Sequence, residues 1–244
     1  MADNNLKTAG ELLAGNSYPG RGIAIGISAD CNKIFAAYFI MGRSANSRNR
    51  VFVRDGCDLM IRPADEAKVE DPSLIIYYPV RKMNNILIVT NGDQTDTIAK
   101  HLIEGGTFDE ALASREFEPD APNYTPRISS IVIMDTAGNA RYELSILKSA
   151  DKNGKSCSRY FFNYEPVAGR GHLIHTYITD DTPLPSFVGE PENIVLSDNL
   201  EDFVSDIWNN LDDDNRISIY GRSVDLAGGE DKDILINKYE VMEG

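Results

Sequence analysis

Three arginines lie within eight residues of one short segment of the chain, interleaved with serine and asparagine. The segment runs from Gly42 to Arg50, between two apolar runs. A guanidinium is a planar fork of donors that fits phosphate or carboxylate, and serine and asparagine add neutral hydrogen bonds. The segment is a candidate anion site, although a solvated hairpin loop explains its composition equally well. The candidate binding residues are Arg43, Ser44, Asn46, Arg48, Asn49 and Arg50.

Three other polar loops contain residues suited to a ligand site. Asn91 and Asp93 join a predicted strand to a predicted helix, where free backbone amides often face a ligand, but helix capping is the commoner role for such an aspartate. Tyr124 and Arg127 lie where an irregular loop enters a strand. Arg170 stands between two glycines, and a plain exposed turn fits it as well as a site does.

The acidic composition excludes several classes of function. The chain has 244 residues and a formal net charge of −14. This charge argues against binding to DNA or RNA and against adsorption to anionic membranes. We expect no bilayer-spanning run and no secretory signal. The three cysteines are few, odd in number and widely spaced, so a disulfide framework is not expected. A reduced, cytoplasmic protein is the natural interpretation.

The hydrophobic pattern predicts about ten strands and two or three helices, and hence one α+β domain, residues 1–244, with antiparallel sheets packed in layers. Thr107 and Glu110 are spaced as a capping box, and Asp198 and Glu201 as a cap pair. The helical segments are a short turn within 6–14, then 95–104, 107 to about 116, and 200–211. The strand-like runs are 23–27, 34–41, 51–53, 59–61, 74–78, 86–89, 128–134, 142–147, 160–162, 173–178, 217–220 and 234–236.

Common catalytic signatures do not fit. The glycines of 20–26 have the wrong spacing for a dinucleotide fingerprint, and Gly154-Lys155-Ser156 lacks the first glycine of a P-loop. The three histidines have no ligand-spaced cysteines or carboxylates, and no nucleophile elbow is present. We therefore expect no metal and no cofactor.

Four motifs, taken in order, resemble the archaeal-type inosine monophosphate (IMP) cyclohydrolase family. They are Gly20-Arg21, the 42–50 segment, Asn91-Gly92 with Thr95-Asp96, and Thr125-Pro126-Arg127-Ile128. The resemblance covers residues 18–180. It implies a four-layer α-β-β-α sandwich like that of N-terminal-nucleophile hydrolases. It also implies a cyclohydrolase that closes 5-formamidoimidazole-4-carboxamide ribonucleotide to IMP with loss of water, and a homo-oligomer, either a dimer or a tetramer.

The resemblance also suggests roles for the candidate residues. Catalytic roles are predicted for Arg43, Asn91, Asp93, Tyr124 and Arg127, and substrate or phosphate binding for Arg21, Ser44, Asn46, Arg48, Asn49, Arg50 and Arg170. A tyrosine is a plausible proton donor, but the sequence does not decide between Tyr124, Tyr77 and Tyr78.

The chain departs from the family pattern in two places. Gln94 stands where a histidine is expected, and Asn123 precedes Tyr124 in the reverse of the family order. If that histidine moves protons, the chain has lost it, so a non-catalytic protein that binds or senses a purine nucleotide is the alternative. A linear-amide hydrolase is disfavoured, because Met1-Ala2 offers no N-terminal nucleophile.

Overall fold

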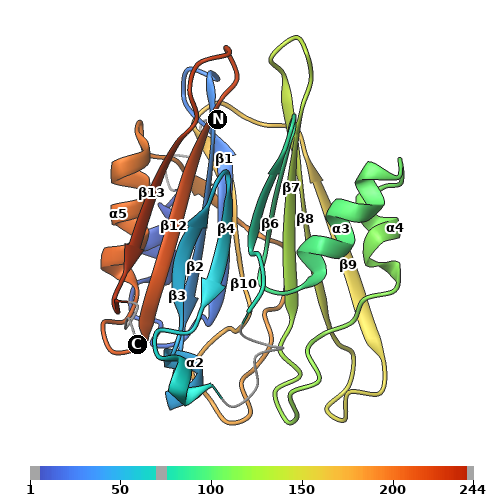
Figure 1. Cartoon of the computed structure of the whole chain (residues 1–244), viewed down its shortest axis with the longest axis vertical. Coiled ribbons are helices and arrows are strands. Elements are labelled where there is room, and N and C mark those ends of the chain that lie inside the picture. The colour runs from blue at the N-terminus through green and yellow to red at the C-terminus, as the bar shows by residue number, and fades with distance from the viewer. Residues whose placement is uncertain (1–5, 70–75, 241–244) are drawn as a thin grey trace.

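Two antiparallel sheets face each other in the computed structural model, which describes residues 6–69 and 76–240 (Figure 1). The first sheet has the order β11 (Glu192–Val195), β10 (Arg170–His175), β1 (Arg21–Ile27), β2 (Lys33–Met41), β12 (Arg216–Asp225) and β13 (Lys232–Asn237). The second has the order β3 (Val51–Asp55), β4 (Asp58–Arg62), β5 (Val80–Met83), β6 (Ile86–Thr90), β7 (Arg127–Met134), β8 (Ala140–Ser149) and β9 (Cys157–Tyr164).

Helices cover the outer face of each sheet, so the layers run helix, sheet, sheet, helix (Figure 1). The helices α1 (Ala9–Leu13) and α5 (Leu200–Asn210) pack on the first sheet, and α3 (Gln94–Ile103) and α4 (Phe108–Ala113) on the second. The short helix α2 (Ala45–Arg48) lies at one end of the sandwich, and a 3₁₀ turn follows at Glu66–Lys68.

The main core lies between the two sheets. In β1, Ile23 and Ile25 face the second sheet, whereas Ala24 faces the helices α1 and α5. Side chains alternate between the two faces of a strand, and here both faces are buried. That double burial explains why β1 and β2 are nearly continuous apolar runs. It also explains why the pattern predicted them well.

The predicted strand over 74–78 is wrong. Residues 74 and 75 lie outside the described part of the chain, residues 76–78 form no strand, and β5 begins only at Val80. Pro79 has no N–H to donate to a ladder. Tyr77 instead turns inward, where its hydroxyl contacts that of Tyr38 at 3.0 Å.

Four other boundaries differ from the expected ones. Arg170 begins β10 and pairs with Val195 of β11, an edge strand that the pattern did not predict. The 42–50 segment contains the helix α2. The helix that begins after Thr107 ends at Ala113, short of the predicted 116. The N-cap of α5 is Asn199, which accepts a hydrogen bond from the Asp202 amide, and not Asp198.

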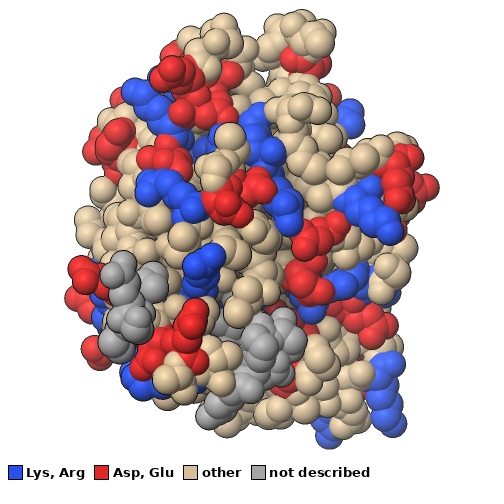
Figure 2. Space-filling model, viewed as in Figure 1, with Lys and Arg blue, Asp and Glu red and all other residues tan. Residues whose placement is uncertain are grey.

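One face of the molecule carries charges of both signs. On the face in Figure 2, basic and acidic side chains are interspersed, so the negative charge is not gathered there into one field. Within residues 6–69 and 76–240, no helix is both long enough and apolar enough to cross a membrane.

Candidate active site: a polar cavity at one end of the sandwich

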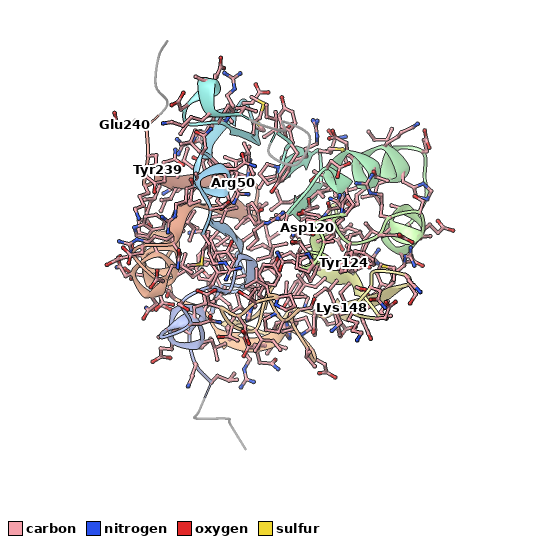
Figure 3. All side chains as sticks on the ribbon, turned by 90° about the horizontal axis from the view of Figure 1, so that it is seen from below. Arg50, Asp120, Tyr124, Lys148, Tyr239 and Glu240 are labelled. Atoms are coloured by element: carbon pink, nitrogen blue, oxygen red, sulfur yellow. The ribbon has the colours of Figure 1, made fainter. Side chains whose placement is uncertain are left out.

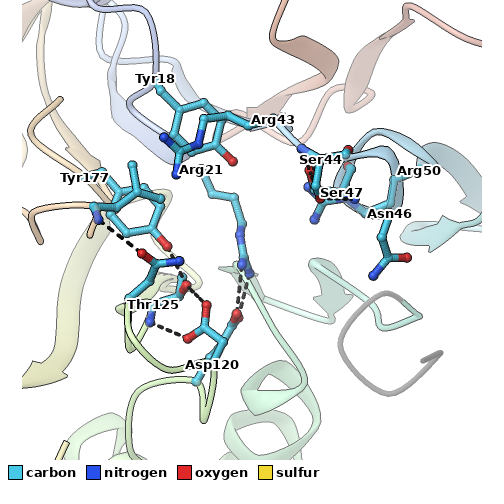
Figure 4. A pocket seen from close by; sticks show the side chains of 14 residues that line it. Tyr18, Arg21, Arg43, Ser44, Asn46, Ser47, Arg50, Asp120, Thr125 and Tyr177 are labelled. Atoms are coloured by element: carbon cyan, nitrogen blue, oxygen red, sulfur yellow. Dashed lines mark hydrogen bonds and ion pairs between the residues drawn. The ribbon is translucent and has the colours of Figure 1, made fainter. Parts of the chain in front are cut away.

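A cavity of about 490 Å³ opens at the end of the sandwich that carries α2 (Figure 4). Its volume lies in the range of small-molecule sites. The start of β1, the α2 segment, the loop before β7 and the segment after β10 form its walls. It is lined by Tyr18, Gly20, Arg21, Arg43, Ser44, Asn46, Ser47, Arg50, Glu118, Asp120, Asn123, Thr125, Tyr177 and Leu184.

Arg21 and Glu118 form a buried ion pair in this cavity. Arg21 Nη1 donates to Glu118 Oε1 at 2.6 Å and Nη2 to Oε2 at 2.8 Å, while Nη1 also donates to the Asn91 carbonyl at 2.6 Å. The side chains are only 13% and 5% exposed. Burial opposes the Arg21 charge, but Glu118 outweighs it, so the pKa of Arg21 is raised. Arg21 therefore stays cationic.

Hydroxyl and guanidinium groups from the α2 segment form the rim. Ser44 caps α2 and accepts from the Ser47 amide at 3.1 Å, and the Ser47 hydroxyl accepts from the Ser44 amide. Arg50 is held from behind, since it donates to the carbonyls of Ser47 and Met41. Arg43 pairs with Asp180 and lies 5.0 Å from the centre of the Tyr18 ring.

The wall opposite the rim carries a carboxyl group, a buried hydroxyl and a phenol in series. The Thr125 amide donates to Asp120 Oδ1 at 2.7 Å, and the Thr125 hydroxyl contacts both Asp120 Oδ2 and the Tyr177 hydroxyl. Figure 4 shows this series of three hydrogen-bonded side chains beside Arg21. Burial raises the pKa values of Asp120 and of Tyr177.

Five of the residues predicted from the sequence line this cavity. They are Arg21, Arg43, Ser44, Asn46 and Arg50. Arg48 and Asn49 come from the same segment but face a separate surface groove beside Lys238 and Tyr239. Because a helix of one turn points its side chains in several directions, the residues predicted in the 42–50 segment are divided between the cavity and that groove.

Asn91, Asp93 and Arg127 do not line the cavity but form a network behind Arg21. The Asn91 side chain donates to the Pro126 carbonyl and accepts from the Ile128 amide. Asp93 makes no capping hydrogen bond to α3 and pairs with Arg115 and Arg127. These side chains fix the backbone whose Asn91 carbonyl holds Arg21.

Gln94 belongs to the same network. It is fully buried, accepts from Arg127 Nη1 at 2.7 Å and donates to Asn91 Oδ1 at 3.1 Å. It is not among the residues that line the cavity. The departure from the family pattern at this position therefore lies in a supporting network.

Tyr124 and Arg170 do not line the cavity either. The Tyr124 hydroxyl donates to the Asn153 carbonyl, and Figure 3 shows Tyr124 beyond Asp120 on the side of Lys148. Arg170 pairs with Val195, one residue from the Gly26–Gly171 pair, at the far end of β1 from Arg21.

Sequence reasoning missed Glu118, Asp120, Thr125 and Tyr177 as cavity residues. Two carboxylates spaced by one residue, in a proline-rich segment just before the Thr-Pro-Arg motif, were the available signal for the acids. Tyr177 follows β10 with no motif to mark it. No group of three or more His, Cys, Asp or Glu in the described ranges is arranged to hold a metal.

The layers and the cavity define an α+β protein with an arginine-lined site between two antiparallel sheets. The chain belongs to the family of IMP cyclohydrolase-like proteins, whose model matches residues 18–230. The match reaches fifty residues beyond position 180, where the resemblance seen in the sequence ends, so α5 and β12 belong to the family pattern too.

Three similar proteins are named IMP cyclohydrolases. The IMP cyclohydrolase of Methanopyrus kandleri is 32% identical over 164 residues, which are 66% of this chain and 75% of that protein. The IMP cyclohydrolases of Methanothrix thermoacetophila and Methanocella arvoryzae are 32% and 31% identical over 119 residues. Each of those two matches covers 47% of this chain and 57% of the relative.

Proposed function

We propose that this chain is an IMP cyclohydrolase that closes 5-formamidoimidazole-4-carboxamide ribonucleotide to IMP with loss of water. The observation that carries the proposal is the arginine-lined cavity, in a member of this family, at a size suited to one nucleotide. An acidic protein needs local positive charge to hold a phosphorylated substrate, and Arg43 and Arg50 supply it there, since the charge of Arg21 is balanced by Glu118.

The rim is the proposed phosphate site. Arg43, Ser44 and Ser47 present a cation and two hydroxyls on one side of the cavity. Asn46 adds an acceptor, because its Oδ1 has no hydrogen-bond partner among the described residues. A ribose hydroxyl or an amide N–H of the substrate can satisfy it. The predicted binding roles of Arg48, Asn49 and Arg170 have no support from their positions.

Arg21 is the proposed stabiliser of the formyl oxygen. Its hydrogen bonds to Glu118 and to the Asn91 carbonyl use three of the five N–H donors of the guanidinium, so two remain for a ligand. Donors held in place by a buried carboxylate need no rearrangement as charge develops. The network of Asn91, Asp93 and Arg127 supports that geometry indirectly, because it fixes the backbone whose carbonyl binds Arg21.

The reaction is intramolecular, which makes positioning a large share of the catalysis. The carboxamide nitrogen attacks the formyl carbon, and the resulting carbinolamine loses water. Holding both groups in contact within the cavity removes much of the entropic barrier. Protons must also leave two nitrogens and reach the departing oxygen. Among the tyrosines, Tyr18 and Tyr177 line the cavity. The three candidates from the sequence, Tyr77, Tyr78 and Tyr124, do not line it.

We further propose that residues 1–244 form one domain, kin to the N-terminal-nucleophile hydrolases, and that the protein works as a cytoplasmic homo-oligomer. The order of layers supports the kinship. The single domain, the cytoplasmic location and the oligomeric assembly are what the family resemblance implies. The alternative of a non-catalytic sensor rested on Gln94, and Gln94 does not line the cavity.

Turnover of the formamido nucleotide, followed by absorbance as IMP forms, tests the proposal. We expect native protein to convert it, and Arg43→Ala to raise KM by about 10- to 100-fold, since a charge-assisted hydrogen bond contributes about 1.5–3 kcal/mol. Arg170→Ala is the matched control, because it removes an arginine at the far end of β1, and it should keep native KM. Binding of the nucleotide without conversion would identify a sensor instead.

A further inference from the structure

The Asp120–Thr125–Tyr177 chain has the connectivity of a proton path. The Thr125 hydroxyl touches a carboxylate oxygen on one side and a phenol oxygen on the other. Thr125 is 1% exposed and Tyr177 4%, so water does not reach the middle of the chain freely. A hydroxyl can donate one hydrogen bond and accept another, so the direction of the chain depends on the protonation of Asp120.

The surrounding structure holds both ends of the chain in place. The Thr125 amide fixes the Asp120 carboxyl through Oδ1. The Tyr177 ring stacks on Tyr18 with centroids 6.0 Å apart. Gly20 has φ of +81°, and a Cβ there would lie 2.6 Å from the Tyr177 ring. The phenol is thus clamped between Thr125 and the segment that precedes β1.

We propose that Asp120, Thr125 and Tyr177 form a relay that carries protons between the reacting atoms in the cavity and the Asp120 carboxylate. This inference rests on the proposed function. With Asp120 ionised, Thr125 donates to Asp120 and Tyr177 donates to Thr125, so the phenol oxygen accepts from the cavity. With Asp120 protonated, all three hydrogen bonds reverse, and the Tyr177 hydroxyl donates into the cavity.

The relay balances the reaction when it runs twice. In the addition, the C–N bond forms, the carboxamide nitrogen gives one proton through Tyr177 and Thr125 to Asp120, and the formyl oxygen becomes an alkoxide. The reverse transfer converts that alkoxide into a hydroxyl. In the dehydration, the formamido nitrogen gives a second proton to the relay, which returns it to the hydroxyl as the C–O bond breaks. Water leaves, and Asp120 is ionised again.

The charged groups around the relay favour such transfers. Glu118 and Arg21 are the charged side chains that act on the Asp120 carboxyl, and they neutralise each other as a pair. Burial raises the pKa of Asp120, which narrows the gap between the carboxylate and the groups with which it exchanges protons. The cycle begins with an ionised Asp120, so kcat should fall as pH drops through the pKa of this carboxyl.

The deciding experiment is the pH profile of kcat for native protein, Thr125→Val, Thr125→Ser and Tyr177→Phe. Valine keeps the branched shape of threonine but removes the hydroxyl through which protons pass. We therefore expect kcat to fall by about 100-fold or more with little change in KM. We also expect the fall of kcat at low pH, the acid limb that Asp120 sets in native protein, to vanish. Serine keeps the hydroxyl and should retain that limb. Phenylalanine should reproduce the valine result from the other end of the path.

Two results would overturn the relay while leaving the proposed function intact. If Thr125→Val turns over slowly but keeps the native acid limb, Thr125 only supports the loop that carries Asp120. If it turns over at the native rate, Asp120 exchanges protons with the cavity directly. Failure of native protein to convert the formamido nucleotide is a different outcome, because it removes the proposed function itself.

Discussion

Arg21 carries a charge inside the molecule, and its burial explains much of the chemistry around it. A buried cation needs a partner and satisfied donors, and Glu118 and the Asn91 carbonyl provide them. That requirement explains why the motif residues Asn91 and Arg127 form a network behind Arg21 without lining the cavity. Sequence reasoning placed them in the site because a polar loop next to a ligand looks the same whether it binds the ligand or holds the residue that does.

Removing one partner of the pair should destabilise the protein strongly. Glu118→Ala leaves Arg21 buried and unpaired, and we expect a loss of about 3–5 kcal/mol in the free energy of unfolding, measured by urea denaturation. The double variant Arg21→Met with Glu118→Met removes both charges and should recover most of that stability without recovering turnover. If Glu118→Ala unfolds at the native urea concentration, the pair is not buried in solution.

Elements with two buried faces were predictable because their apolar runs are long and leave little choice of structure. The strands β1, β2 and β7 are such cases. Edge elements were not predictable in the same way. β11 has four residues, and its hydrogen bonds to β10 are set by tertiary contact. The helix α2 is one turn closed by a serine capping box, too short for a periodic signal.

The N-cap of α5 is a different residue in the structure from the one that the sequence pattern predicts. Asn199 accepts from the Asp202 amide at 2.8 Å, whereas the pattern favoured Asp198. Asn199→Ala should lower the free energy of unfolding by about 1 kcal/mol, the usual cost of losing a cap. Asp198→Ala, one residue earlier, is the matched control and should leave the urea midpoint unchanged. Equal losses from both variants would mean that the cap is shared.

At the scale of the whole molecule, the site depends on how the two sheets are held together. Arg21 comes from the first sheet, while Glu118 and Asp120 precede β7 of the second. The cavity therefore exists only while the sheets keep their relative position. At the strand ends away from Arg21, His172 of β10 contacts Tyr142 of β8 at 2.7 Å and stacks on Tyr164 of β9 at 3.5 Å between ring centres.

This contact predicts a pH dependence of stability. Burial lowers the pKa of His172 to about 4, below its ordinary value near 6.5. Between these values the unfolded chain binds a proton at this residue that the folded protein does not, so stability falls as pH drops from 6.5 toward 4. Urea midpoints at pH 7 and pH 5 should differ more for native protein than for His172→Gln. Because all other groups are shared, equal differences would mean that His172 already takes up its proton in the folded sandwich, and that the contact between the sheets does not exclude the charge.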